Sequence, residues 1–200
     1  MMDRFDCLKL LASDLVDDQT LVVTSLSTNT SVFSSIRESG AGFYGLNMGL
    51  CTPFALGVSL AFPNRKVLAL DSDGSLMIDT SALITVADAD PKNLVILVFD
   101  NQAYARMGPT FTARRTDLEK MAQGAGIAST MTVRTMDEFS GAVAKALDSE
   151  GPTFIVAKVE TETVRAQATR PRRTYGHAMR ETFVEQVLQL PDHYALRTPK

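Results

Sequence analysis

The spacing of hydrophobic residues along this chain switches repeatedly between a helical and an extended pattern. Apolar residues that recur every three or four positions predict helices, and short apolar or β-branched runs bounded by turn residues predict strands. The predicted helices span residues 4–16, 31–37, 49–62, 76–89, 117–124, 136–147 and 178–190. The predicted strands span residues 20–24, 66–70, 93–100 and 153–159.

Three of the predicted strands are apolar throughout instead of alternating with polar residues. Residues 67–70, 94–99 and 154–159 have this pattern, which is typical of strands that helices cover on both faces. Strands of this kind in alternation with helices favour a parallel sheet between two helical layers. We therefore predict an α/β fold with three α/β/α layers and a mostly parallel central sheet.

Composition and charge exclude several classes of protein. The 200 residues are 45% hydrophobic and 22% charged, as in ordinary globular domains, and we expect one domain over residues 1–200. A net charge of −3 gives no general reason to bind nucleic acid. The longest wholly apolar run, residues 94–99, is far shorter than the ~18 residues of a membrane span. We expect a cytoplasmic protein with neither nucleic acid nor membrane as a partner.

The two cysteines are too few for a disulfide scaffold and fit a reducing compartment. Cys51 lies in a predicted buried helix, where a structural thiol is commoner than a reactive one. The sequence has two histidines and no evident catalytic base.

Polar side chains follow two of the buried strands. Asp73 lies among small residues after the strand at 66–70, and Asn101 follows the strand at 93–100. The carboxyl ends of parallel strands meet at one edge of the sheet, so we expect the two loops to lie near each other. One carboxylate, one amide, a backbone carbonyl and a diphosphate would suit Mg²⁺. Either loop alone is explained as well by a turn whose Asp or Asn caps a helix.

These two loops resemble the signature of thiamine diphosphate enzymes. Residues 72–75 read Ser-Asp-Gly-Ser and residues 100–104 read Asp-Asn-Gln-Ala-Tyr, where the family has Gly-Asp-Gly and then a pair ending in Asn. Residues 45–49, Gly-Leu-Asn-Met-Gly, are similar to the stretch that these enzymes place before the signature. The resemblance spans about residues 5–190 and is greatest for the β subunits of sulfopyruvate decarboxylase and the C-terminal half of phosphonopyruvate decarboxylase. It implies the thiamine diphosphate-binding fold.

The resemblance also implies a set of cofactor-binding residues. Asp73 and Asn101 would bind Mg²⁺ by their side chains, and Ala103 by its backbone carbonyl. The cofactor itself would contact Thr28, Asn29, Leu46, Asn47, Met48, Asp73, Gly74, Ser75, Asn101, Ala103 and Tyr104. Within this set, Gly74 and Ser75 would hold the diphosphate, with Thr28 and Asn29 as further candidates. The carbonyl of Leu46 would accept from the aminopyrimidine.

Met48 would be the apolar wedge that bends the cofactor, although plain core packing would also explain a methionine at this position. Three other positions depart from the family pattern. Ser72 replaces the first Gly, Asp100 replaces the first Asn, and Ser27 stands where close relatives often have Gly.

The implied function is the diphosphate-binding β subunit of a heteromeric decarboxylase that acts on a small anionic 2-oxo acid. Sulfopyruvate, converted to sulfoacetaldehyde and CO₂, is the preferred substrate. The alternatives are phosphonopyruvate, a carboligating enzyme, and a non-catalytic module that only binds thiamine diphosphate. A generic Rossmann domain is disfavoured because the first strand-to-helix turn lacks Gly-x-Gly-x-x-Gly.

No glutamate of this chain matches the one that activates the cofactor in the family. We therefore expect no catalytic residue here and place the activating Glu on a pyrimidine-domain α subunit, in an α₂β₂ assembly. Candidate ligands for the substrate anion are Arg106, Arg170 and His177, since arginine suits sulfonate and phosphonate oxygens.

The candidate anion ligands have simpler explanations as well. The basic stretch 165–173 would equally be a solvated face or a subunit contact, and His177 a solvated or packing residue. Residues 106–111 lack the Gln and His that relatives carry beside the substrate. The resemblance also implies a mobile C-terminal segment, residues 160–200, that closes over the site.

Overall fold

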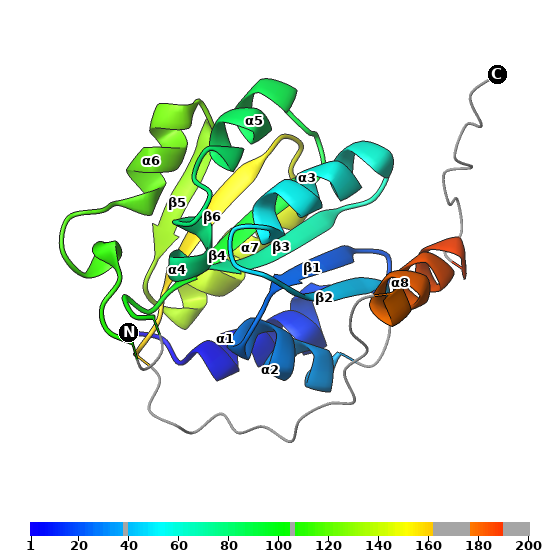
Figure 1. Cartoon of the computed structure of the whole chain (residues 1–200), viewed down its shortest axis with the longest axis horizontal. Helices are drawn as coiled ribbons and strands as arrows, with labels where there is room; N and C mark the ends of the chain where they lie inside the picture. Colours follow the sequence, from blue (N-terminus) through cyan, green and yellow to red (C-terminus); the bar gives the residue numbers. More distant parts are fainter. Residues whose placement is uncertain (38–39, 105–106, 162–176, 190–200) are drawn as a thin grey trace.

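A six-stranded parallel sheet forms the centre of the computed structural model, which describes residues 1–37, 40–104, 107–161 and 177–189 (Figure 1). The strand order is β2-β1-β3-β4-β6-β5, and every neighbouring pair is parallel. The strands are β1 Leu21–Ser25, β2 Gly42–Leu46, β3 Val67–Ser72, β4 Leu94–Asp100, β5 Ser129–Val133 and β6 Thr153–Lys158. The predicted α/β fold with a parallel sheet is confirmed.

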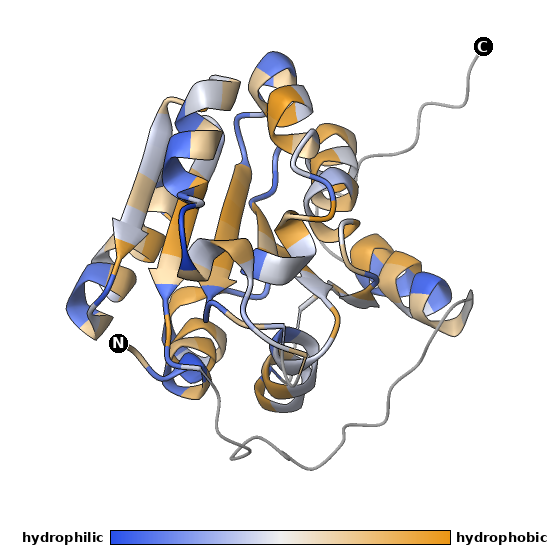
Figure 2. Ribbon diagram, turned by 60° about the vertical axis from the view of Figure 1, so that its left-hand side comes forward, coloured by the Kyte–Doolittle hydropathy of each residue, from blue (hydrophilic) through white to orange (hydrophobic). Residues whose placement is uncertain are grey.

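Helices cover both faces of the sheet because successive strand side chains point to opposite sides. The apolar core on one face lies under α3 (Cys51–Ala61), α5 (Ala82–Ala89), α6 (Leu118–Ala125) and α8 (His177–Gln189). The core on the other face lies under α1 (Arg4–Leu10), a π-helical turn (Leu11–Leu15), α2 (Thr28–Ile36) and α7 (Met136–Asp148). The central strands are the most hydrophobic part of the ribbon (Figure 2).

The two cysteines belong to these cores. Cys7 lies in the core under α1 and Cys51 in the core under α3, and both are fully buried. Burial, with smaller contributions from Asp3 and Asp6, raises the pKa of Cys7 to about 12. Burial also raises the pKa of Cys51. A neutral buried thiol is unreactive, which agrees with a structural role.

The helix predicted over residues 76–89 begins later than expected, because residues 77–81 are not helical. A short helix, α4 (Asp73–Leu76), follows β3 directly, and α5 begins only at Ala82. The predicted strands at 20–24, 66–70, 93–100 and 153–159 correspond to β1, β3, β4 and β6. The strands β2 and β5 were not predicted, because both are short edge strands that are only partly buried. In the part of the chain that is described, no helix is long and apolar enough to cross a membrane.

The order of the strands decides where a ligand can bind. From β1 the chain moves outward to β2 at one edge, and from β3 it moves through β4 toward the other edge. The order therefore reverses between β1 and β3, and the loops that follow these neighbouring strands diverge. Parallel sheets bind ligands at such a switch point, beyond the carboxyl ends of the strands. The sequence motifs at residues 72–75 and 100–104 both lie at the carboxyl ends of their strands, β3 and β4.

Candidate functional site

Asp73 is a buried carboxylate at the carboxyl edge of the sheet. It begins α4 directly after β3 and is only 1% exposed. One of its oxygens, Oδ2, accepts hydrogen bonds from the hydroxyls of Thr110 at 2.6 Å and Thr112 at 3.3 Å. Burial and the nearby charge of Asp100 raise the pKa of Asp73, against the lowering effect of the Thr110 hydroxyl. A second buried carboxylate beside the first makes this a place where a cation would be stabilised.

Asp73 follows β3 and Asn101 follows β4, and these two strands are neighbours in the sheet. Ser72 is in register with Phe99, so the residues that follow these two are adjacent at the sheet edge. The loop after β4 then folds back as a hairpin, in which Thr110 donates its N–H to the carbonyl of Gln102 and Tyr104 donates to that of Gly108. The expectation that the two polar loops lie together is confirmed.

The hairpin arranges the backbone around Ala103. The Asn101 side-chain oxygen accepts from the Ala103 N–H at 3.2 Å. The carbonyls on either side of Ala103, those of Gln102 and Tyr104, accept hydrogen bonds from Thr110 and Met107. The Ala103 carbonyl is in neither of these bonds, so the hairpin is compatible with its predicted role as a metal ligand.

Tyr104 packs against the backbone of α4 at Gly74. A Cβ atom on Gly74 would lie 2.5 Å and 2.7 Å from two carbon atoms of the Tyr104 ring. Only glycine allows this approach, because real Cβ atoms do not come within 3.0 Å of other heavy atoms. Gly74 therefore allows the Tyr104 ring to pack directly against the backbone of loop 73–75.

The segment after β2 is tied to the loop that holds Asp73. The Gly49 N–H donates to the Ser75 hydroxyl oxygen at 3.2 Å, and Gly49 has a φ of +83°. Met48, directly before it, is half-buried and belongs to neither apolar core. This position argues against plain core packing for Met48. The Leu46 carbonyl accepts from the Leu26 N–H at 2.8 Å and has a second lone pair for the predicted contact.

Asn29 links the ends of two strands. Its amide group donates to the carbonyls of Leu70 at 3.2 Å and Asp71 at 2.9 Å and to the Ser25 hydroxyl. Its side-chain oxygen is buried without a partner in the described part of the chain. Asn29 thus joins β1 to β3 at the switch point, and contact with a diphosphate remains a prediction for it and for Thr28.

Residues 29–157 match the family model described as "Thiamine pyrophosphate enzyme, C-terminal TPP binding domain". The chain belongs to this family. The recognition made from the motifs at residues 72–75 and 100–104 is thereby confirmed.

Several named proteins are similar to this thiamine pyrophosphate-binding chain. The β subunit of sulfopyruvate decarboxylase from Methanocaldococcus jannaschii is 30% identical over 158 residues, which cover 78% of this chain and 82% of the subunit. The phosphonopyruvate decarboxylase of Streptomyces viridochromogenes is 31% identical over 76% of this chain and 38% of its own length. The structure of a thiamine diphosphate-dependent 4-hydroxybenzoylformate decarboxylase from Rhodococcus jostii shares the fold, with a TM-score of 0.66, 23% identity, and coverage of 80% of this chain and 33% of that one.

The donor set fits a metal that is held together with the diphosphate. The described residues include no group of three or more His, Cys, Asp or Glu that could hold a metal ion. Asp73 and Asn101 alone would leave most positions around Mg²⁺ to other oxygen atoms, and Mg²⁺ sites commonly use phosphate oxygens in this way. The arrangement is therefore consistent with the thiamine pyrophosphate-binding family.

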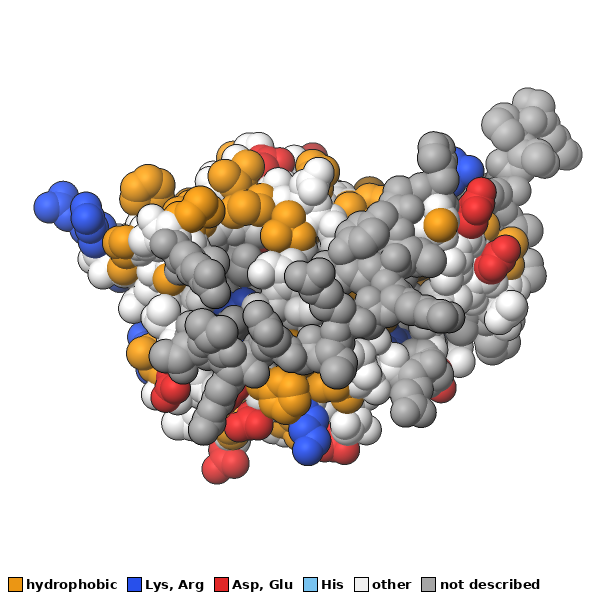
Figure 3. Space-filling model, turned by 60° about the horizontal axis from the view of Figure 1, so that its bottom comes forward, with side chains coloured by type: hydrophobic (Ala, Val, Ile, Leu, Met, Phe, Trp, Pro, Cys, Tyr) orange, Lys and Arg blue, Asp and Glu red, His pale blue; other side chains and the backbone are white. Residues whose placement is uncertain are grey.

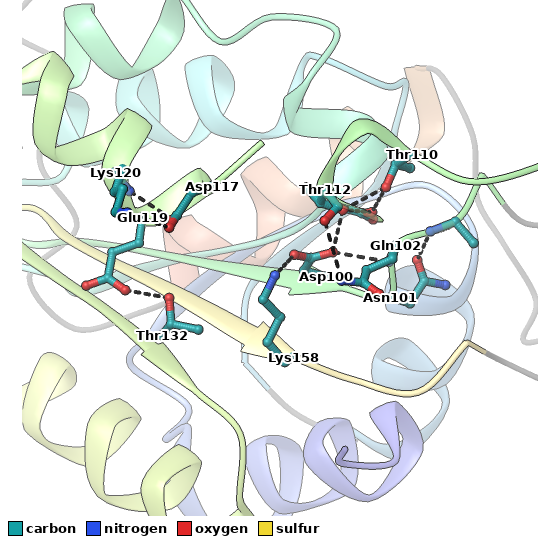
Figure 4. Close-up of polar contacts among 12 residues, drawn as sticks. Asp100, Asn101, Gln102, Thr110, Thr112, Asp117, Glu119, Lys120, Thr132 and Lys158 are labelled. Atoms are coloured by element: carbon teal, nitrogen blue, oxygen red, sulfur yellow. Dashed lines mark hydrogen bonds and ion pairs between the residues drawn. The ribbon is translucent and has the colours of Figure 1, made fainter. Parts of the chain in front are cut away.

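Sequence reasoning missed three residues of this network. Thr110 and Thr112 bind Asp73, and Thr112 also donates to Asp100 at 2.8 Å, which Lys158 of β6 contacts in turn (Figure 4). Hydroxyls in a loop carry no motif, so the two threonines gave no signal. A lysine that ends an apolar strand was a signal that could have been used.

Two of the three candidate anion ligands lie outside the described residues. These are Arg106 and Arg170, together with the rest of the basic stretch 165–173. His177 begins α8, and its side chain is also outside the described part. Their predicted contact with the substrate remains a prediction. The same holds for the closing role of residues 160–200, of which 160–161 and 177–189 are described.

Ser27 has a backbone conformation that favours glycine. Its φ of 78° and ψ of −136° precede the first residue of α2, and such angles are essentially restricted to glycine. Relief of this strain, which is of the order of 1–3 kcal/mol, should exceed the extra chain entropy of glycine, about 0.5–1 kcal/mol. We expect Ser27→Gly to raise the free energy of unfolding by about 1 kcal/mol in urea denaturation.

Ser31→Gly is the matched control, since it places glycine inside the same helix. It should lower the free energy of unfolding by about 0.5–1 kcal/mol. If both variants are destabilised equally, Ser27 is not strained.

Proposed function

We propose that this chain is the β subunit of a sulfopyruvate decarboxylase. The observation that carries the proposal is similarity to three archaeal β subunits of that enzyme, each matched over 80–84% of its length. The sulfopyruvate decarboxylase of Methanosarcina acetivorans is 36% identical over 139 residues, which are only 35% of its length. The absence of a membrane-spanning helix from the described residues is compatible with the cytoplasmic location that we propose.

Residues at the carboxyl edge of the sheet would each contact a different part of the bound cofactor and its metal ion. Asp73, Asn101 and the Ala103 carbonyl would hold Mg²⁺, and Gly74 and Ser75 would hold the diphosphate. The Leu46 carbonyl would accept from the aminopyrimidine, and Met48 would be the apolar wedge that bends the cofactor. Asn47 would contact the cofactor, and Tyr104 would lie beside it. When bound, thiamine diphosphate supplies the carbanion that adds to a 2-oxo acid and then takes up the electrons released with CO₂.

A partner subunit would complete this site. Similar proteins are named as β subunits, which supports a partner subunit. We place the activating Glu on that α subunit, in an α₂β₂ assembly. Exposed hydrophobic side chains form several groups on the face shown in Figure 3. The exposed large hydrophobic residues in the loops after β1, β2, β3 and β4 are Leu26, Leu50, Ile78, Met107 and Phe111. Apolar side chains around a polar site suit a protein partner.

Decarboxylation requires the partner in this proposal. We expect the chain with its α subunit, thiamine diphosphate and Mg²⁺ to release CO₂ and sulfoacetaldehyde from sulfopyruvate, and the chain alone to release neither. Phosphonopyruvate as the better substrate would favour the second candidate, which similarity to phosphonopyruvate decarboxylases supports. A 2-hydroxy ketone as the product would indicate carboligation.

Calorimetry separates the enzyme subunit from a non-catalytic module. Tight Mg²⁺-dependent binding of thiamine diphosphate by the chain alone, with no turnover beside any α subunit, would contradict the proposal. Weak binding that becomes tight when the α subunit is added would support it.

A further inference from the structure

Lys158 and Asp100 form an ion pair directly behind the candidate metal ligands. The two residues are register partners on the neighbouring strands β6 and β4, so their side chains leave the sheet side by side. Asp100 is 0% exposed and the Lys158 side chain is 14% exposed. The Lys158 ammonium contacts the Oδ2 atom of Asp100. Figure 4 shows Lys158 reaching Asp100 from the side opposite to Thr112.

The other oxygen of Asp100 closes the metal-binding loop at both ends. Oδ1 accepts the Gln102 N–H at 3.1 Å at the start of the hairpin and the Thr112 hydroxyl at 2.8 Å at its end. The first contact holds Gln102 at a φ of +61°, where a non-glycine residue needs local support. Asp100 therefore fixes the segment that presents Asn101 and Ala103.

The same network continues from Asp100 to Asp73. The Thr112 hydroxyl, which has a single proton, lies within hydrogen-bonding distance of Asp100 at 2.8 Å, of Thr110 at 2.7 Å and of Asp73 at 3.3 Å, and the Thr110 hydroxyl donates to Asp73 at 2.6 Å. Polar contacts thus run without interruption from the Lys158 ammonium to the carboxylate that would bind Mg²⁺. Two residues, Asp100 and Thr112, lie between Lys158 and that carboxylate.

A buried carboxylate needs its counter-charge to keep this geometry. Removal of one partner from a buried ion pair leaves an uncompensated charge, which is far more costly than loss of the pair as a whole. Without Lys158, the Asp100 carboxylate would turn toward water. That movement takes Oδ1 away from the Gln102 N–H and the Thr112 hydroxyl.

We propose that Lys158 is a positioning residue for the metal-binding loop. It holds Asp100 so that Oδ1 clamps both ends of the hairpin and brings Asn101 and Asp73 into place. The pair also accounts for the aspartate at position 100, where the family pattern has asparagine, since a buried charge there is balanced by the lysine in register with it. This inference rests on the proposed metal and cofactor site.

The test is the Mg²⁺ dependence of thiamine diphosphate binding, measured by calorimetry on the full chain, alone or with its α subunit. We expect Lys158→Met to raise the Mg²⁺ concentration for half-saturation by at least about tenfold, as for other residues that orient metal ligands. The double variant Lys158→Met/Asp100→Asn removes both charges of this pair, and its amide oxygen can still accept from Gln102 and Thr112. Its half-saturation should lie closer to wild type than that of either single variant.

Lys66→Met is the matched control. Lys66 is a partly buried lysine whose ammonium contacts the Ser149 carbonyl. It lies just before β3, at the opposite end of that strand from Asp73. It should leave the Mg²⁺ half-saturation unchanged. A purely structural role for Lys158 would lower the melting temperature and leave the half-saturation as in wild type, and this result would overturn the proposal. If Lys158→Met does not fold, a double variant that binds more weakly than Asp100→Asn alone would overturn it equally.

Failure of the proposed function gives a different result. If the wild-type chain binds no thiamine diphosphate with Mg²⁺, alone or with its α subunit, both proposals fall. If wild type binds and Lys158→Met binds equally well, only the role of Lys158 falls.

Discussion

Asp73→Asn should abolish the Mg²⁺-dependent binding of thiamine diphosphate. The substitution keeps the shape of the side chain and removes the only carboxylate among the proposed metal ligands. We expect affinity to fall by at least about 100-fold, the upper range for residues that only support a metal ligand. Calorimetry at saturating Mg²⁺ measures the loss. Retained affinity would contradict the assignment of the site.

Without cofactor, Asp73→Asn should not destabilise the chain, and at pH 7 it should be more stable than wild type. Burial and Asp100 raise the pKa of Asp73, so the fold disfavours its ionised form. Stability from this group is present below the usual pKa of aspartate and is lost as pH rises through the raised pKa. Wild type should therefore lose stability relative to Asp73→Asn between pH 4 and pH 7, a comparison that urea denaturation at both pH values makes.

Asp79→Asn is the control for both measurements. It removes the same charge from a half-buried position whose carboxylate accepts from the Ser81 hydroxyl. We expect it to leave cofactor binding unchanged. Equal losses for the two variants would show that net charge, and not coordination by Asp73, governs binding.

Gly74→Ala should damage both stability and cofactor binding. The added Cβ would lie 2.5 Å from the Tyr104 ring, and overpacking of this kind costs about 1–3 kcal/mol. Tyr104 lies in the hairpin that also holds Asn101, so displacement of its ring should disturb that hairpin. Each 1.4 kcal/mol by which the strain in the bound state exceeds that in the free state weakens binding by about tenfold. Urea denaturation and calorimetry measure the two effects.

Two controls test whether the Tyr104 ring is the cause. Gly57→Ala adds the same methyl group to an exposed helical position with no other atom within 4 Å, and it should stabilise by about 0.5–1 kcal/mol. In a Tyr104→Ala background, Gly74→Ala should cost little, because the clash is gone. An unchanged cost in that background would place the strain elsewhere.

The sequence predicted the parts of the fold that hydrophobic burial alone decides. The strands β1, β3, β4 and β6 lie inside the sheet. Continuous apolar runs predicted β3, β4 and β6, and a short β-branched run predicted β1. The strand β2 contains Gly42 and Gly45 and lies at an edge, as does the partly exposed β5. Their existence depends on pairing with a neighbour, which no local pattern records.

The sequence likewise predicted those residues of the candidate site that directly follow buried strands. Asp73 and Asn101 follow buried strands, so their neighbourhood could be derived from the rule for parallel sheets. Thr112 contacts Asp73 only because the hairpin returns across the sheet edge, and Lys158 contacts Asp100 only through the register of β4 and β6. Contacts that depend on loop path or register need the structure.

The division of the site among several strands has a consequence for how the chain acquires function. The strands β1, β2, β3 and β4 each supply one of its loops, and all are joined by parallel pairing between residues far apart in the sequence. Such pairings form late and slowly, and a ligand that binds only the finished arrangement stabilises that arrangement alone. A half-folded chain should not recognise the cofactor, so cofactor binding during refolding would report the moment at which the whole sheet is assembled.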